Sequence, residues 1–555
     1  MSVQLTPVPL AATPLNGTVV LDSATRIEFV QDAQGAAEFL AEYLRRGTRW
    51  PVPATADNKQ SSGPVIRFVV SEPVADGSAP NNAMLDAGTT ATLFAHEESY
   101  QLRVEGTEIL VAATTAAGWF WAVQSLRQLL PATLETAVAL GEPTAGETPA
   151  RKKTAAQSMA AVTINAVEIL DAPRFAYRGI MLDLARSFLT VPQIKHQLDV
   201  MASFKFNVLH LHLSDDQAWR IHINNPAPNP SGLDFEALSR VGGPGAVNTP
   251  GWGLSPGIGG FLTQDDYSEI VAYAAGLHIV VVPEIDVPGH VNAALAALPA
   301  LNPDGVAKAM NTTGEVGYST LDAQNPLTRV FVQEVFAQLA KITPGPYLHI
   351  GGDEAHVTSK EDYLSMVTDF AALGAESKTV IGWNEYAQAQ LPEGSVIQFW
   401  HGDQTEVLRQ INTNGAKLIM SPGAGSYLDQ KYVSEDPIGL EWAAMGDWYA
   451  YYGWEPVLDG VAESSVLGIE APLWSETVRG ADQANWLIYP RAIAIAELAW
   501  SAESQRNAQD FAARLGGLGQ RLVNLDVTFH PSPSISWNAQ PRDPFANETS
   551  ANREE

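Results

Sequence analysis

The sequence contains no cysteine, and this absence excludes disulfide bonds, thiolate metal sites and a cysteine nucleophile. Basic residues are scarce as well, because 33 Lys and Arg stand against 62 Asp and Glu, a formal net charge of -29 at pH 7. Nucleic acids and anionic membranes are bound by clustered basic side chains, so we expect neither as a partner. The acidic surplus is typical of a well-solvated surface.

Long apolar runs and targeting segments are also missing. No stretch approaches the roughly 18 consecutive apolar residues of a membrane span. The start, MSVQLTPVPLAATPL, lacks the basic and apolar regions of a signal peptide. The sequence as written therefore predicts a cytoplasmic protein, or a secreted one if a leader has been removed, and the lack of cysteine fits either compartment.

Residues 1–172 are predicted to form an α/β accessory domain, because short strand-like and helical patterns are mixed there. Within it, residues 131–160 are rich in Ala, Thr, Glu, Gly and Pro, which predicts a flexible loop or linker. At the other end, residues 506–555 are predicted to hold a helix (508–525) and a disordered tail, NETSANREE. The strands expected in the first domain are 19–21, 65–70, 100–104 and 109–112, and the helices are 36–46 and 115–130.

Residues 173–505 show a different pattern, in which eight apolar runs of strand length are each followed by a helix-length segment. Continuous apolar runs alternating with helices indicate buried parallel strands, and eight of them predict a closed (β/α)8 TIM barrel. An open α/β sheet is the alternative, but no Gly-rich dinucleotide or phosphate loop supports it. The expected strands are 179–184, 207–213, 279–285, 347–350, 379–383, 396–400, 417–420 and 466–471.

Each of these runs ends in polar or aromatic residues, and active sites of such barrels lie at the carboxyl ends of the strands. Aromatic rings stack on the apolar faces of sugars, while carboxylates and Arg bind hydroxyl groups. A phosphorylated ligand would require a helix N-terminus with glycines or several cations, and Arg186 is the single clear candidate cation at these strand ends. The pattern predicts a site for a neutral carbohydrate, lined by these strand ends: Asp183 and Arg186; His212, Asp215 and Asp216; Glu284, Asp286 and His290; Asp353, Glu354 and His356; Trp383; Trp400; Tyr427 and Asp429; Trp474 and Glu476.

Several of these residues also have a structural interpretation. The strand-end tryptophans can cap the core, Asp183 and Glu284 can bind backbone or Arg, and Asp216 can orient its loop. His210 and His212 alternate on one strand, which favours satisfied core histidines. His349 and His356 beside two carboxylates are compatible with a metal site, but the other strand ends supply aromatics rather than further ligands. His290 follows Pro288-Gly289 in a turn, which favours a functional role.

The string His349-Ile-Gly-Gly-Asp353-Glu354 resembles the signature of the family-20 glycoside hydrolases, the β-N-acetylhexosaminidases, in their bacterial, actinomycete-type form. Further segments resemble that family in the same order: MLDLAR (181–186), NVLHLHLSDDQAWR (207–220), VVPEIDVPGH (281–290), IGW (381–383), QFW (398–400), YLD (427–429) and APLWSE (471–476). The resemblance covers residues 175–500. It departs from the family pattern in a longer stretch between residues 223 and 262, and in Ser187, where a His is common.

The resemblance implies an N-terminal domain without catalytic residues and a barrel that removes terminal N-acetylhexosamines with net retention. The sugar's own 2-acetamido oxygen is then the nucleophile, in the substrate-assisted variant of glycoside hydrolysis. Asp353 and Glu354 are consecutive, so on an extended strand end we expect their side chains to diverge, which suits two different tasks better than one acid–nucleophile pair.

The resemblance also implies individual roles. Glu354 is the general acid and then base, with a raised pKa; His290 and Asp215 form a relay that tunes it; Asp353 binds the acetamido N–H; and Tyr427 holds the acetamido oxygen.

Substrate binding is assigned in the same way. Trp383, Trp400 and Trp474 wall the acetamido methyl; Arg186, Asp429 and Glu476 bind the ring hydroxyls; and Trp442 is a platform for the next sugar. No metal or other cofactor is needed.

A carbohydrate-binding barrel without catalysis is the main alternative, although a lectin has no need of a proton donor. A family-18 chitinase is disfavoured because no D-x-x-D-x-D-x-E string occurs, whereas transglycosylation stays open. The sequence does not distinguish GlcNAc from GalNAc, and it does not determine the natural substrate, oligomeric state or export.

Overall fold

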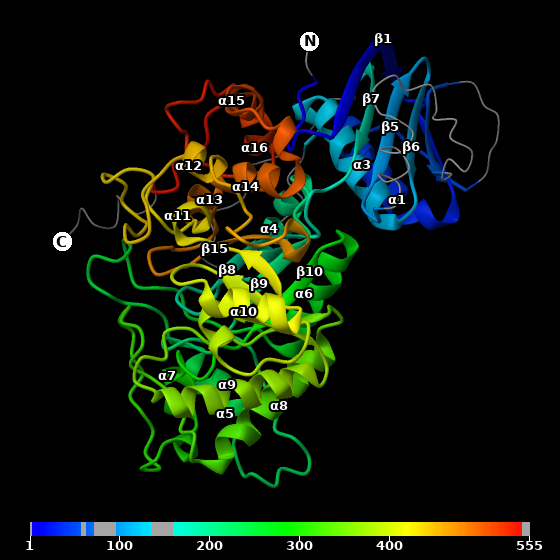
Figure 1. Cartoon of the computed structure of the whole chain (residues 1–555). Coiled ribbons are helices and arrows are strands. Elements are labelled where there is room, and N and C mark those ends of the chain that lie inside the picture. The colour runs from blue at the N-terminus through cyan, green and yellow to red at the C-terminus, as the bar shows by residue number, and fades with distance from the viewer. Residues whose placement is uncertain (1–2, 57–62, 72–95, 136–158, 547–555) are drawn as a thin grey trace.

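The computed structural model describes residues 3–56, 63–71, 96–135 and 159–546 (Figure 1). The N-terminal part is built on a seven-stranded sheet in the order β1-β7-β5-β6-β4-β2-β3. Two helices, α1 (Gln34–Thr48) and α3 (Ala116–Leu129), pack together and on this sheet. The strands are β1 (Ala11–Leu21), β2 (Arg26–Phe29), β3 (Ala54–Thr55), β4 (Val65–Val70), β5 (Tyr100–Glu105), β6 (Glu108–Ala113) and β7 (Val162–Asp171).

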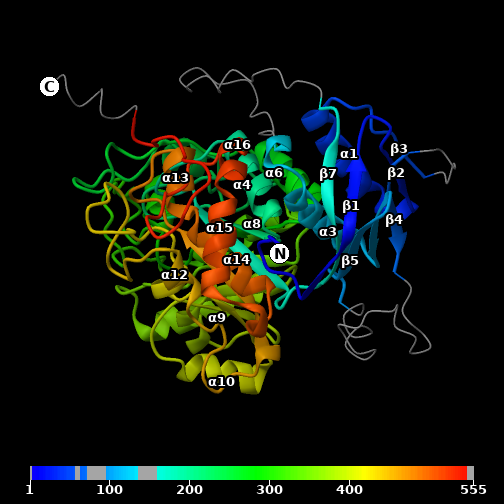
Figure 2. The same ribbon diagram turned by 90° about the horizontal axis from the view of Figure 1, so that it is seen from above.

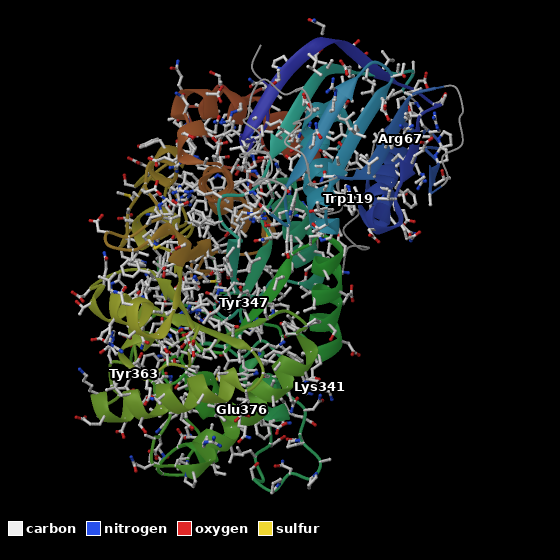
Figure 3. The ribbon with its side chains drawn as sticks, turned by 45° about the vertical axis from the view of Figure 1, so that its right-hand side comes forward. Arg67, Trp119, Lys341, Tyr347, Tyr363 and Glu376 are labelled. Atoms are coloured by element: carbon white, nitrogen blue, oxygen red, sulfur yellow. The ribbon has the colours of Figure 1, made fainter. Side chains whose placement is uncertain are left out.

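Both helices and all four strands that the sequence predicted in this part are present. Thr115 caps α3 by accepting a hydrogen bond from the Gly118 N–H, and Trp119 fixes the helix to the sheet by donating to the Val69 carbonyl at 2.9 Å (Figure 3). Strand β7, which was not predicted from the sequence, lies between β1 and β5 and pairs antiparallel with both. The predicted loop 131–160 and the predicted disordered tail fall largely or wholly outside the described residues.

The second part is a closed barrel of eight parallel strands, which confirms the predicted TIM barrel. The last strand pairs with the first, from Gly468 opposite Tyr177 to Leu473 opposite Leu182, and this pairing closes the barrel. The alternative prediction of an open α/β sheet is therefore wrong. The strands, in their order around the barrel, are β8 (Tyr177–Asp183), β9 (Val208–His212), β10 (Val280–Glu284), β11 (Tyr347–His349), β12 (Thr379–Trp383), β13 (Val396–Phe399), β14 (Lys417–Met420) and β15 (Val466–Leu473).

Helices surround the barrel, and several begin at side-chain caps that the sequence supplies. Thr263 and Asp266 form a capping box, in which the side chain of each accepts from the backbone N–H of the other, and the Gln193 side chain accepts from the Thr190 N–H. The longer helices are α4 (Val191–Ser203), α6 (Gln264–Gly276), α8 (Pro326–Ile342), α9 (Lys360–Ala375), α10 (Thr405–Asn414), α13 (Ala481–Ile488) and α14 (Arg491–Trp500). Shorter ones are α5 (Glu236–Gly242), α7 (Asn292–Ala297), α11 (Gly423–Ser426) and α12 (Trp448–Tyr452), and the 3₁₀ turns are Gln31–Ala33, Ala132–Leu134, Pro299–Leu301, Asn384–Gln388, Glu463–Ser465 and Glu503–Gln505.

The N-terminal domain lies beside the barrel in both ribbon views (Figures 1 and 2). Two ion pairs join the two parts: the buried Arg178 donates to the half-buried Glu98 at 2.7 Å, and Lys205 donates to Asp171 at 2.8 Å, with both of these residues buried. Arg178 and Lys205 lie at the amino ends of β8 and β9. These two ion pairs therefore join the N-terminal domain to the amino ends of the strands, opposite their carboxyl ends.

The predicted C-terminal helix is split at Leu518 into α15 (Ala508–Gly517) and α16 (Gly519–Asn524). Arg514 of α15 forms a two-pronged ion pair with Glu497 of α14, with both N–O distances 2.7 Å. Arg521 of α16 reaches Glu135 of the N-terminal domain. None of the helices that the structure describes has the length and apolar character needed to cross a bilayer.

Candidate active site

The predicted site residues form one connected cluster at the carboxyl ends of the barrel strands. Within it, the buried polar atoms that have no hydrogen-bond partner among the described residues include Arg186 Nη1, Asp353 Oδ1, Asp429 Oδ1 and Glu476 Oε2. An unsatisfied buried polar atom costs about 1–3 kcal/mol, so such atoms are rare and demand an explanation. Their convergence from four strand ends indicates a site built for a ligand with many hydroxyl or amide groups.

One imidazole connects the candidate catalytic carboxylates. His290 Nδ1 lies 3.1 Å from Asp215 Oδ1, while its Nε2 lies 3.4 Å from Glu354 Oε2 and 3.6 Å from Asp353 Oδ2. Asp215 is buried and also accepts from Arg186 Nη2 at 2.7 Å. Asp215 thus orients His290, and His290 faces both members of the Asp-Glu pair.

The two glycines before this pair have a steric function. Gly351 has φ +68°, and a Cβ there would lie 1.8 Å from Asp286 Oδ1, so a side chain is excluded. Asp286 Oδ1 also accepts from the Gly352 N–H at 3.1 Å. Tyr363 of α9 donates to the Gly352 carbonyl at 2.6 Å (Figure 3). The Gly-Gly turn therefore lets the chain pass closely over Asp286.

The expected extended backbone at the Asp-Glu pair is wrong. β11 ends at His349, and Glu354 has φ +45°, in the left-handed region that non-glycine residues rarely adopt. Because of this turn, the carboxyl groups of Asp353 and Glu354 do not diverge but reach the same nitrogen of His290. A strained conformation of this kind is characteristic of functional sites.

The protonation preferences of the site follow from its charges. Burial alone would raise the pKa of Glu354, but the hydrogen bond and positive charge of His290, assisted by Arg186, lower it. The raised pKa that we expected for Glu354 is therefore wrong. Burial alone would lower the pKa of His290, but the charges of Asp215 and Asp353 raise it well above its ordinary value. In this arrangement His290 holds the proton that the His290–Glu354 pair shares.

Asp353 pairs with a second carboxyl group, that of Asp286. Burial raises the pKa of both groups; the negative charge of Asp353 adds to the rise at Asp286, and that of Glu354 adds to the rise at Asp353. Two adjacent buried carboxyl groups cannot both ionise easily. Asp353 Oδ2 lies 3.6 Å from Nε2 of the cationic His290, which favours the ionised form of Asp353 and leaves the proton of the pair on Asp286.

Aromatic rings form a continuous wall beside these groups. The centroids of Trp383 and Trp474 are 5.8 Å apart, those of Trp474 and Tyr427 6.3 Å, and those of Tyr427 and Trp400 6.2 Å with nearly parallel planes. Trp442 meets Trp400 and Tyr427 edge-on at 5.9 and 5.7 Å. Trp442 is 55% exposed, so it lies at the rim, whereas Trp383 is buried.

Arg186, Asp429 and Glu476 occupy another side of the cluster. The Arg186 guanidinium lies 5.0 Å above the Trp474 ring. Burial raises the pKa of Asp429 well above its ordinary value, and the charge of Glu476 adds to this. Burial likewise raises the pKa of Glu476 to about 7, against the opposing charge of Arg186.

Residues interpreted as structural lie in the supporting shell. Asp183 accepts from the backbone N–H groups of Ala185, Arg186 and Ser475. Asp216 accepts from the Asn292 N–H and the Ser319 hydroxyl, which fixes the loops around His290. Glu284 accepts from Trp383 Nε1 at 2.9 Å and contacts three histidines, His210, His212 and His349.

Metal-ligating geometry occurs in four buried triplets among the described residues, one of which is His210, Glu284 and His349. His356 belongs to none of them, so the structure does not bring together the His349–His356 site that we considered as an alternative. In the first triplet the ligand atoms contact each other directly, with His349 Nδ1 2.9 Å from Glu284 Oε1. These contacts are those of an ion-pair network.

Three residues of the site were not assigned a role from the sequence. Asp286 was noted only as a strand end. Gln217 accepts from Arg186 Nε at 3.0 Å, and Glu385 accepts from Trp400 Nε1 at 3.0 Å. Burial and the charge of Asp353 raise the pKa of Glu385 to about 8. The position of Glu385 two residues after β12 was the available signal.

The stretch 223–262 wraps around the end of β8. Arg220 holds it by donating to the carbonyls of Gly243 and Gly260, both at 2.7 Å, as well as to those of Leu184 and Ala185. Ser187, one of the two departures noted in the sequence, accepts from the Ile258 N–H at 3.3 Å. Both departures from the family pattern therefore meet in one contact, next to Arg186.

A TIM barrel with paired carboxylates, an imidazole and an aromatic wall at its carboxyl end is the architecture of a glycoside hydrolase. The family "Glycosyl hydrolase family 20, catalytic domain" matches residues 175–503, and "Glycosyl hydrolase family 20, domain 2" matches residues 2–172. The chain belongs to glycosyl hydrolase family 20, as the sequence motifs indicated.

Individual relatives agree over most of the chain. A β-N-acetylhexosaminidase of Cellulomonas fimi is 36% identical over 467 residues, 83% of this chain and 86% of that protein. The structure of the family-20 β-N-acetylhexosaminidase of Streptomyces coelicolor A3(2) has a TM-score of 0.81 at 34% identity, covering 97% of this chain and 99% of that one. A mutant Streptomyces plicatus β-hexosaminidase in complex with its product GlcNAc has a TM-score of 0.82 at 35% identity, covering 97% and 98%.

Proposed function

We propose that this β-N-acetylhexosaminidase removes terminal non-reducing GlcNAc or GalNAc residues with Glu354 as its general acid and base. The 2-acetamido oxygen of the substrate attacks C1, the C1–O bond breaks, and the Glu354 proton passes to the leaving oxygen. Water then attacks C1 of the oxazolinium-type intermediate, the bond from C1 to the acetamido oxygen breaks, and the water gives a proton to the Glu354 carboxylate, so the configuration is retained. The observation that carries this assignment is the convergence of Asp353, Glu354 and His290 beside unsatisfied polar atoms.

The proton of Glu354 comes from its pairing with His290. In the arrangement described above His290 holds this shared proton, and the two groups titrate as a unit. When the leaving-group oxygen of the substrate lies close to Glu354, the neutral form of the Glu354 carboxyl group is favoured. The reason is that this oxygen can accept a hydrogen bond from the protonated carboxyl group. His290, held by Asp215, is then the internal source and later the recipient of the proton.

Asp353 is assigned to the acetamido group. Its Oδ1 has no partner among the described residues and can accept the acetamido N–H. Positive charge develops on the nitrogen during attack, and a carboxylate stabilises it in a buried site. Asp286 supports this role, because it holds the proton of the pair and leaves Asp353 ionised. Tyr427 is placed to hold the acetamido oxygen against C1.

The remaining residues bind the sugar. Trp383, Trp400 and Trp474 surround the acetamido methyl, and the unpartnered atoms of Arg186, Asp429 and Glu476 bind the hydroxyls at C3, C4 and C6. Trp442, exposed at the rim, is the platform for the next sugar. The GlcNAc complex of the Streptomyces plicatus relative supports GlcNAc as one substrate.

Hydrolysis of the p-nitrophenyl β-glycosides of GlcNAc and GalNAc by the wild type and Glu354→Gln tests this function. We expect turnover that collapses in the variant, since Gln cannot supply a proton. Folded wild-type protein that binds GlcNAc without turnover would instead establish a carbohydrate-binding barrel.

A further inference from the structure

The proton relay of the site continues into the interior of the barrel. Asp215 Oδ2 lies 2.8 Å from His212 Nε2, and His212 Nδ1 lies 2.6 Å from Glu284 Oε2. Glu284 Oε2 in turn lies 3.2 Å from His210 Nε2, and His210 Nδ1 lies 2.8 Å from Glu470 Oε1. Each of these residues is at most 1% exposed.

The alternation of imidazole and carboxylate determines the charge of His212. Its two ring nitrogens each face a carboxylate oxygen within hydrogen-bond distance, and neither carboxylate oxygen can donate while ionised. Both nitrogens must therefore carry a proton, which makes His212 an imidazolium. The charges of Glu284 and Asp215 also outweigh burial and raise the pKa of His212 well above its ordinary value.

Asp215 is correspondingly fixed as a carboxylate. Its Oδ2 faces two cationic donors, His212 and Arg186, while Oδ1 accepts from the Asp216 N–H at 2.6 Å and faces His290. The titratable and charged groups around His212 come from every neighbouring element: Asp183 and Arg186 after β8, His210 and Asp215 on and after β9, Glu284 and Asp286 of the β10 end, and His290 beyond them. Trp474 covers its ring edge-on at 5.0 Å.

We propose that His212 is a positioning residue of the reaction, a buried cation that limits how strongly Asp215 draws protons onto the His290–Glu354 pair. This inference rests on the proposed function of Glu354. Because a nearby positive charge disfavours further protonation, His212 keeps the proton affinity of the pair low enough for transfer to the leaving group. Glu284 acts in the opposite sense, by partly neutralising His212.

The test uses opposite charge changes on the two sides of the chain. His212→Gln removes the cation and supplies a neutral side-chain amide that can still form hydrogen bonds, and we expect the alkaline limb of the pH–kcat profile to move to higher pH. Glu284→Gln removes the anion, and we expect that limb to move to lower pH. A unit charge several ångströms away at an effective dielectric constant of about 20 changes a pKa by on the order of one unit.

His196→Gln is the matched control, because His196 is also buried but lies on α4, outside the barrel, and its ring bonds to the Leu525 carbonyl; its profile should equal that of the wild type. If Glu284→Gln does not fold, His212→Gln and His212→Asn provide the test. An unmoved alkaline limb in folded His212 variants, with only a lower rate, would overturn the proposal. The proposed function itself would be refuted by a different result, namely that the wild type shows no turnover, or shows turnover that Glu354→Gln does not abolish.

Discussion

Replacing Asp353 by Asn separates the charge of this residue from its shape. Asn keeps the volume and an oxygen that accepts the acetamido N–H, so we expect KM for p-nitrophenyl β-GlcNAc to change only a few-fold. The negative charge opposite the developing cation is lost. Removing one well-placed electrostatic stabiliser from a water-excluded site costs about 2.7–4 kcal/mol, so kcat should fall roughly 10²–10³-fold.

The structure favours the high end of this range. Asp353 is 7% exposed, so water screens its charge poorly. Asp286, which stays protonated beside it, cannot replace that charge without itself ionising in a buried position. The loss should therefore appear in kcat and kcat/KM alike, as for an interaction made mainly in the transition state.

The assay compares p-nitrophenyl β-GlcNAc with p-nitrophenyl β-glucoside, which has no acetamido group. The wild type should hydrolyse the glucoside very slowly, and Asp353→Asn should change that slow rate by less than about tenfold, because the interaction in question does not exist there. Equal loss on both substrates would refute the role of Asp353 at the acetamido group. Thermal melts of both proteins exclude misfolding as the cause.

Three further predictions concern the supporting structure. Gly351→Ala should reduce kcat more than 10²-fold in a folded protein, because the added Cβ would lie 1.8 Å from Asp286 Oδ1; near-normal kinetics would contradict the steric argument. Arg220→Met should lower the melting temperature by several degrees and raise KM, because it leaves backbone carbonyls around the 223–262 stretch unpaired at about 1–3 kcal/mol each; an unchanged melting temperature would show that this stretch is held otherwise. Burial raises the pKa of Glu385 to about 8. Between its ordinary pKa and pH 8 this carboxyl group binds more protons in the folded than in the unfolded protein, so the folded protein loses stability as the pH rises through that window. In thermal melts from pH 5 to pH 8, Glu385→Gln should therefore become more stable relative to the wild type, and a difference in melting temperature that does not change with pH would contradict the raised pKa.

The barrel was predictable because its strands are buried on both sides and read as continuous apolar runs. The observed strands agree with the predicted ones within about two residues at each end, and the polar residues that terminate them do meet in space. The distances between Asp215, His290 and Glu354 required the fold, since these residues come from three different strands.

What the sequence could not predict depends on contacts between distant segments. The left-handed turn at Glu354 follows Gly351, which passes closely over Asp286, 65 residues earlier. The low pKa of Glu354 depends on which groups face His290. The roles of Arg220 and Glu385 consist of hydrogen bonds to loops that have no periodic pattern.

The central claim is that the substrate's own acetamido oxygen attacks C1, and kcat/KM for p-nitrophenyl glycosides with fluorinated N-acyl groups tests it most directly. Each fluorine withdraws electrons and weakens the carbonyl oxygen as a nucleophile, while the leaving group and ring stay the same. We predict a steep fall from the acetyl through the fluoroacetyl to the trifluoroacetyl substrate. A rate that is insensitive to fluorination would contradict the account and indicate a nucleophile supplied by the protein.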